Sequence, residues 1–104
     1  MELQNLSLNA SNLIQVHGDN MYPKLSAGNL ISIKPVEFEY LVYGHPYVIT
    51  FQNGDTYIKY IKKGKDENHL KLEDHNKFYE PKEFHIDLIK CYYTIIGVVK
   101  KEMM

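Results

Sequence analysis

The chain has 104 residues, of which 44% are hydrophobic and 24% are charged, and its formal net charge is −1. This length suits one domain, and the composition is that of an ordinary globular protein. All twelve basic residues are lysines. Arginine, the residue best suited to bidentate contacts with phosphate and guanine, is missing, so we do not expect this chain to read DNA or RNA directly.

The sequence favours a cytoplasmic location. A single cysteine, Cys91, cannot form an internal disulfide, which indicates a reducing compartment. The first twenty residues lack a basic start followed by an apolar core, so no signal peptide is expected. No apolar run approaches the roughly 20 residues that a membrane-spanning helix needs, so no membrane role is expected.

The N-terminal part predicts an arm followed by one domain. Residues 1–12 are interpreted as an arm or the remnant of a linker, and residues 13–104 as the domain. Residues 13–17 (LIQVH) predict a short strand. Residues 20–25 predict at most one helical turn, with Asn20 as its N-cap.

The middle of the chain has the residue patterns of β-strands. Residues 29–36 (NLISIKPV) have the period of a half-buried strand, which Pro35 should end or place at a sheet edge. Residues 37–46 are interpreted as a connection. The pair Asn53-Gly54, between the β-rich runs YVITF and TYIKYIKK, predicts a hairpin.

The remaining elements complete a mainly β fold. After a turn at residues 63–68, residues 69–73 predict a strand, residues 74–84 a loop stiffened by Pro81, and residues 92–99 a buried strand. Together these patterns predict mostly antiparallel strands in a partly open barrel or sandwich, with one short helical turn.

The order of these motifs resembles the C-terminal domain of the LexA-like and phage-repressor peptidases. These are serine–lysine self-cleaving proteins related to signal peptidase. Their opening motif runs Gly-Asp-Ser-Met-x-Pro-x-Leu-x-x-Gly-Asp. The matching positions here are Gly18, Asp19, Met21, Pro23, Leu25 and Gly28. The resemblance spans residues 13–100 and implies that 13–104 is one LexA-like domain.

The resemblance implies a nucleophile position and a base position. Lys59, in the stretch TYIKYI, takes the place of the lysine that accepts the serine proton. Such a lysine acts as a base only when its amine is neutral. Strand alternation puts Lys59 on one face with Tyr57 and Ile61. The nucleophile position holds Asn20, whose amide cannot form the usual acyl intermediate.

Two further positions depart from the family pattern. The motif ends in Gly28-Asn29 instead of glycine–aspartate, and Tyr60 replaces the arginine expected after the lysine. A substitute nucleophile would have to be Ser26, Ser32 or Thr56. Ser26 lies in the loop beyond the turn, and Thr56 is expected on the strand face opposite Lys59.

The resemblance therefore implies a catalytically silent regulatory and dimerisation domain of a repressor. Its partners would be a second copy and a peptide segment or partner repressor held in the cleft between residues 18–25 and Lys59. DNA would be reached only through a separate DNA-binding domain. Whether the protein is an enzyme stays open, leaning towards no. A serine–lysine peptidase whose nucleophile was replaced, and an unrelated small β-barrel binding module, are the alternatives.

No metal or cofactor is expected. The histidines and acids, among them His17, His69, Asp74 and His75, match no zinc-ligand spacing. The implied chemistry would use protein side chains alone.

Overall fold

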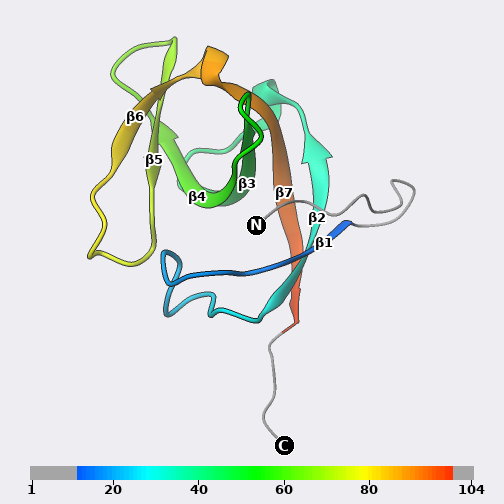
Figure 1. The fold of residues 1–104 in the computed structure, drawn as a ribbon. Coiled ribbons are helices and arrows are strands. Elements are labelled where there is room, and N and C mark those ends of the chain that lie inside the picture. The colour runs from blue at the N-terminus through cyan, green and yellow to red at the C-terminus, as the bar shows by residue number, and fades with distance from the viewer. Residues whose placement is uncertain (1–11, 100–104) are drawn as a thin grey trace, which may run out of the picture.

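The computed structural model describes residues 12–99, so the predicted arm lies outside the described residues except for Asn12. Seven strands form one antiparallel sheet in the order β1-β2-β7-β3-β4-β5-β6 (Figure 1). The strands are β1 (Asn12–Gln15), β2 (Leu30–Val36), β3 (His45–Phe51), β4 (Thr56–Lys63), β5 (His69–Glu73), β6 (Lys82–His85) and β7 (Ile89–Val99). The mainly β prediction is confirmed.

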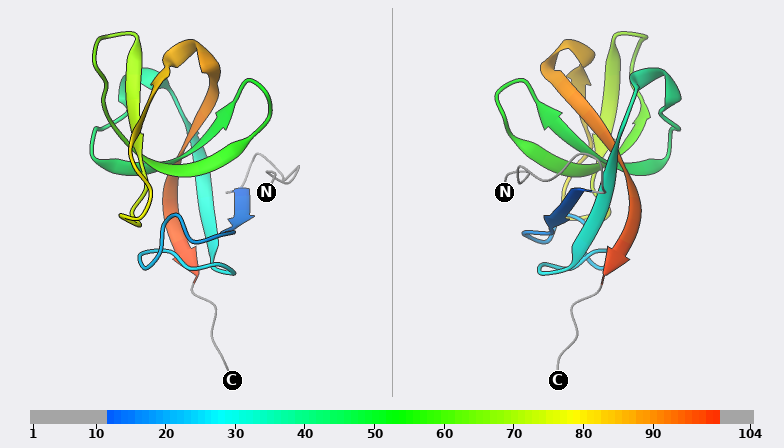
Figure 2. Two further views of the ribbon diagram at one scale, coloured as in Figure 1. Left: turned by 60° about the vertical axis from the view of Figure 1, so that its left-hand side comes forward. Right: turned by 90° about the vertical axis from the view of Figure 1, so that its right-hand side faces the viewer.

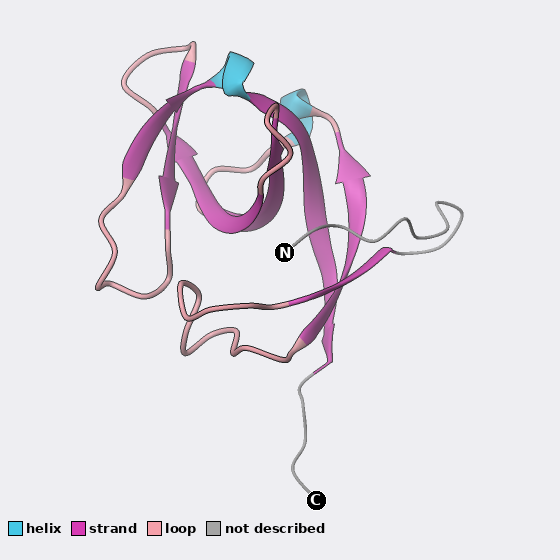
Figure 3. Ribbon diagram, viewed as in Figure 1, coloured by secondary structure: helices cyan, strands magenta, loops and turns pink. Residues whose placement is uncertain are grey.

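Helical structure among the described residues is confined to single turns (Figure 3). Two 3₁₀ turns, η1 (Phe38–Tyr40) and η2 (Ile86–Leu88), lie at connections between strands. At the predicted helical turn, one bond of helical spacing runs from the Leu25 N–H to the Met21 carbonyl oxygen at 2.8 Å. None of the helices in residues 12–99 is long and apolar enough to cross a membrane.

The predicted hairpin is confirmed. Strands β3 and β4 pair antiparallel from Thr50 opposite Thr56 to His45 opposite Ile61. Gly54 has a φ of +95°, a conformation that glycine adopts without a steric penalty. The Asp55 N–H donates to Asn53 Oδ1 at 2.9 Å, which closes the turn locally.

Two strand predictions need correction. Residues 82–84 were expected within a loop but belong to β6, because Phe84 pairs opposite Leu70 on the free edge of β5. Strand β7 begins at Ile89, earlier than expected, because Ile89 pairs with Phe51 across an irregularity in the ladder. Tertiary pairing extends strands beyond their local signals in both cases.

Pro35, which was expected to end its strand or to place it at a sheet edge, is the second-last residue of β2. Among the described residues, β1 pairs with β2 from Gln15 opposite Leu30 to Asn12 opposite Ile33, and Pro35 lies opposite Tyr93 of β7. Proline lacks the N–H that a second neighbour would need.

The sheet is curled, and its two faces contribute to two small cores (Figure 1). Strand β3 shows the division, since Val48 packs in one cluster while Tyr47 and Ile49 pack in the other. The first cluster also contains Met21 and Leu25, from the connection between β1 and β2. This connection is thereby anchored against the sheet.

The connection between β1 and β2 lies beside the connection between β5 and β6 (Figure 2). Hydrogen bonds join the two, beginning with the Asn76 N–H, which donates to the carbonyl oxygen of Asn20 at 2.8 Å. The fold therefore places residue 20 against a segment that is distant in sequence.

Candidate functional site

The 18–29 turn is shaped by two glycines and two apolar anchors. Gly18 and Gly28 have φ values of +74° and +95°, which disfavour residues that carry a Cβ. Met21 and Leu25 are each 3% exposed and bury their side chains in the first core cluster. These four motif residues give the turn its shape. Pro23 follows a cis peptide bond.

The amide that replaces the motif's final aspartate keeps a structural role. Asn29 is 4% exposed, and its Oδ1 accepts a 3.0 Å hydrogen bond from the Ser26 N–H. A carboxylate oxygen at the same place would accept the same bond. The exchange of aspartate for Asn29 is therefore compatible with the turn.

The connection between β5 and β6 holds the turn from outside. Tyr79 donates from its hydroxyl to Asp19 Oδ1 at 2.7 Å, and Asn76 Nδ2 donates to the Asp19 carbonyl oxygen at 2.9 Å. The hydrogen bond to Asp19 is the largest of the effects that raise the pKa of Tyr79. With the Asn76 N–H bond to the Asn20 carbonyl oxygen, three hydrogen bonds hold Asp19 and Asn20, two of them at main-chain oxygens.

The side chain of Asn20 differs from its main chain in its hydrogen bonding. Its main-chain carbonyl is bonded, but within the part of the chain that the structure describes its amide group has no hydrogen-bond partner. Neither the expected N-cap bond nor a bond to Lys59 is formed. The half-buried amide instead lines two cavities.

Lys59 lies on the strand face that the alternation predicts. Ile61 is fully buried in the second core cluster, whereas Ile58 and Tyr60 pack against the first. The Lys59 Nζ lies 5.5 Å from the centroid of the Tyr57 ring. The side chain of Lys59 therefore lies beside an aromatic ring on the same face of the strand.

The amine of Lys59 is paired with an acid that directly follows β5. Its Nζ lies 2.7 Å from Asp74 Oδ1, and the two side chains are only 18% and 5% exposed. Charged hydrogen bonds at this distance are stronger than neutral ones, and water screens a buried pair weakly. Asp74 is therefore the hydrogen-bond partner of the Lys59 side chain.

Two cavities meet at the pair of predicted site residues. One of about 350 Å³ has aromatic walls that include Phe51 and Phe84. The other, of about 240 Å³, is lined by β1 and by the beginning of the 18–29 turn. Asn20, Tyr57 and Lys59 line both cavities, so the two cavities form one cleft.

One side of β4 is unpaired along this cleft. Strand β3 pairs with β4 at residues 56–61, but β5 pairs with it only at residues 60–63. Within residues 12–99, therefore, the β5 side of residues 56–59 carries no strand. Unpaired main-chain groups of this kind can receive an added strand.

Tyr60, which departs from the family pattern, and the candidate substitute nucleophiles Thr56 and Ser32 each have a partner elsewhere in the fold. Tyr60 Oη lies 2.9 Å from His75 Nδ1, and burial raises the pKa of Tyr60. Thr56 Oγ1 lies 3.3 Å from Thr50 Oγ1. Ser32 pairs opposite Gly97 in the ladder between β2 and β7, away from the cleft.

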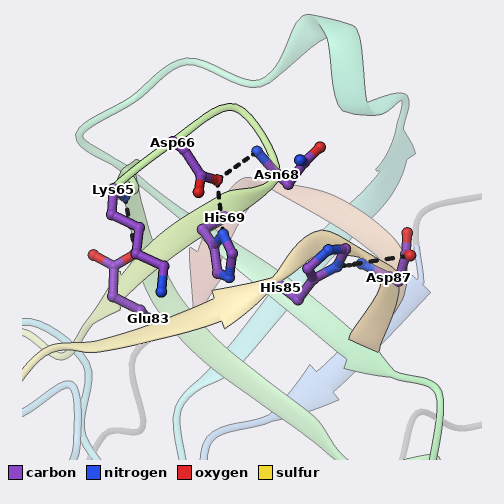
Figure 4. A network of polar contacts seen from close by, with 7 residues as sticks. All are labelled: Lys65, Asp66, Asn68, His69, Glu83, His85 and Asp87. Carbon is purple, nitrogen blue, oxygen red and sulfur yellow. Dashed lines mark hydrogen bonds and ion pairs between the residues drawn. The ribbon is translucent and has the colours of Figure 1, made fainter.

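The histidines lie in small local networks. His69 Nδ1 contacts Asp66 Oδ1 at 2.7 Å, and His85 Nδ1 accepts a 3.1 Å hydrogen bond from the Asp87 N–H (Figure 4). The two imidazole rings pack edge to face across β5 and β6. Among residues 12–99, no three histidine, cysteine or acidic side chains come together as a metal site.

The predicted site residues did not include Asp74, Asn76 or Tyr79. The alternation along β5 indicated that Asp74 is buried. Leu70, Leu72 and Asp74 are every second residue, and all three are buried. A carboxylate on the buried side of a strand needs a hydrogen-bond or ion-pair partner. No comparable local signal exists for Asn76 and Tyr79, whose bonds reach a turn far away in the sequence.

Fold and site define an all-β domain in which a glycine-bounded turn and a strand lysine share a cleft. The chain belongs to the Peptidase S24-like family, whose model matches residues 4–100. A search of curated proteins found no match.

Proposed function

We propose that this chain is a non-cleaving S24-like regulatory domain that holds an extended peptide in the cleft between residues 18–25 and Lys59. The unpaired side of residues 56–59 carries this proposal, because it offers main-chain groups beside two cavities. A peptide added there as a strand would place alternate side chains in the cleft.

The residue at position 20 supports holding rather than cutting. The nitrogen of the Asn20 amide is not nucleophilic, because its lone pair is delocalised into the carbonyl. Its oxygen and nitrogen can instead hydrogen-bond a peptide that lies along the cleft. The family's turn is thus kept, and its nucleophile is absent.

Peptide binding can be tested with peptides of random sequence, selected on the wild-type chain. Tyr57 is 46% exposed and lines both cavities, so Tyr57→Ala should weaken a selected peptide about tenfold without unfolding the domain. Tyr40→Ala is the matched control, since Tyr40 is 68% exposed and lines neither cavity of the cleft.

Two results would contradict the proposal. One is equal binding of the selected peptides by the Tyr57 and Tyr40 variants in fluorescence anisotropy. The other is full binding by peptides whose alternate amides are N-methylated, because strand addition needs those N–H groups.

The proposal includes a second copy of the chain. Leu13, Leu30 and Val99 are exposed on neighbouring strands β1, β2 and β7, around the Ser32–Gly97 pair. Such an apolar face is typical of an interface. As the domain of a cytoplasmic repressor, a dimer would couple a separate DNA-binding domain to a symmetric operator.

Sedimentation velocity tests this part. We expect dimers at high micromolar concentration and a shift towards monomers in Leu13→Glu. The control is Val42→Glu, since Val42 is exposed outside this face. A wild-type chain that stays monomeric would remove the basis for the dimerisation role.

A further inference from the structure

Two ion pairs of the same geometry join lysines of β4 to acids at the end of β5. Lys59 pairs with Asp74, and Lys62 pairs with Glu73, each at 2.7 Å. Their surroundings differ, because the Lys59 and Asp74 side chains are 18% and 5% exposed while those of Lys62 and Glu73 are 47% and 19% exposed. The first pair lies in the cleft, and the second is an ordinary surface pair.

The buried pair has a consequence for the chemistry of Lys59. An ammonium has no lone pair, so the amine can accept a proton or attack an electrophile only after it loses one. A carboxylate at 2.7 Å stabilises the charged form, and most strongly where little water reaches the pair. Removing Asp74's charge would favour the neutral amine.

On the basis of the proposed function, we propose that Asp74 is a positioning residue that holds Lys59 as an ammonium. The site is then blocked twice, once at Asn20 and again at the base. A serine restored at position 20 would have no group to take its proton.

The reaction that Asp74 would prevent is cleavage of a peptide bond by a serine at position 20. The serine oxygen would bond to the peptide carbonyl carbon while its proton passed to a neutral Lys59 amine. The C–N bond would then break, and the leaving nitrogen would take that proton. Water would hydrolyse the ester, releasing the acid fragment and restoring the serine.

Competitive acetylation with acetic anhydride tests the state of Lys59 directly. A neutral amine forms an amide, acetate leaves, and the proton passes to water. Mass spectrometry then gives the rate for each lysine. In the wild-type chain, Lys59 should react more slowly than Lys62. Asp74→Asn should raise the rate of Lys59 about tenfold, and Glu73→Gln should leave it unchanged.

Several outcomes would overturn the inference. One is an unchanged acetylation rate of Lys59 in the folded Asp74→Asn chain. If that variant does not fold, Asp74→Ser is measured instead. Another, which needs no variant, is a wild-type chain in which Lys59 and Lys62 are acetylated at equal rates. Cleavage of a selected peptide by Asn20→Ser alone would also show that the base is already free.

These results are distinguishable from failure of the proposed function. If no peptide binds the cleft, the proposed function is wrong while the acetylation rates still report on Asp74. If a peptide binds but Asp74→Asn leaves Lys59 slow, only the inference about Asp74 is wrong. Cleavage by Asn20→Ser/Asp74→Asn, and not by Asn20→Ser, would support both blocks.

Discussion

Tyr79 donates a 2.7 Å hydrogen bond to the carboxylate of Asp19, although the two residues are 60 positions apart in the sequence. Beside it, Asn76 bonds the carbonyl oxygens of Asp19 and Asn20. The turn that contains Asn20 is thus held between its own apolar anchors and a connection that is distant in sequence. Its shape depends on tertiary contacts as well as on its glycines.

Asn76→Ala should loosen this turn. The variant loses two side-chain bonds, one to the Asp19 carbonyl and one from the Phe78 N–H, but keeps the main-chain bond to Asn20. We expect a loss of about 1 kcal/mol in the free energy of unfolding and faster amide exchange in residues 18–25. Urea unfolding and hydrogen exchange measure these effects. Asn68→Ala, in the connection between β4 and β5, is the control; equal exchange in both variants would contradict the role of Asn76.

Asn29 allows the final motif position to be tested. Asn29→Ala removes the acceptor for the Ser26 N–H and should cost about 1–2 kcal/mol. Asn29→Asp keeps an acceptor oxygen and should stay within about 1 kcal/mol of the wild type. Thermal and urea unfolding at neutral pH compare the two. A larger loss in Asn29→Asp than in Asn29→Ala would show that the exchange of aspartate for asparagine is not structurally neutral.

Gly64 is required by close packing in the connection between β4 and β5. A Cβ there would meet the main-chain carbonyl of His69 and would lie 2.8 Å from the Leu70 nitrogen. Because main-chain atoms cannot rotate away, Gly64→Ala should cost about 2–3 kcal/mol. Gly54→Ala is the control, since that site is open and only its positive φ is strained. The prediction is wrong if Gly54→Ala is the more destabilising variant in urea unfolding.

Tyr92 should make the fold sensitive to alkali. Burial raises the pKa of Tyr92 to about 12, above the value of 10.0 for a free phenol. Its contribution to stability is therefore complete below about pH 10 and is lost as pH rises towards 12. Over that window the group should remove about 1.4 kcal/mol per pH unit.

Tyr92→Phe isolates this effect, because it keeps the buried ring and removes the ionisable hydroxyl. We expect its stability to fall less steeply than that of the wild type in urea unfolding between about pH 10 and 12. Tyr40→Phe serves as the control, since Tyr40 is 68% exposed. Parallel pH profiles for wild type and Tyr92→Phe would refute the prediction.

The sequence predicted local structure where the signal was local. The alternation of residues 29–36 predicted β2, and Asn53-Gly54 predicted the hairpin between β3 and β4. Strand β6 was missed because KEFH lacks a strong pattern of its own and becomes a strand by pairing with β5. The arm at residues 1–12 is untested, since only Asn12 of it is described.

For the site, the sequence by itself determined which groups are present: a glycine-bounded turn, an amide at Asn20 and a lysine on the cleft-facing side of β4. Only the tertiary structure decided what those groups do to one another. It brought Asp74 to Lys59 and Asn76 to Asn20, and it left residues 56–59 without a strand on the β5 side. The physical reason is that alternation and turn chemistry act between near neighbours, whereas an ion pair or a hydrogen bond depends on which strands the curled sheet brings together.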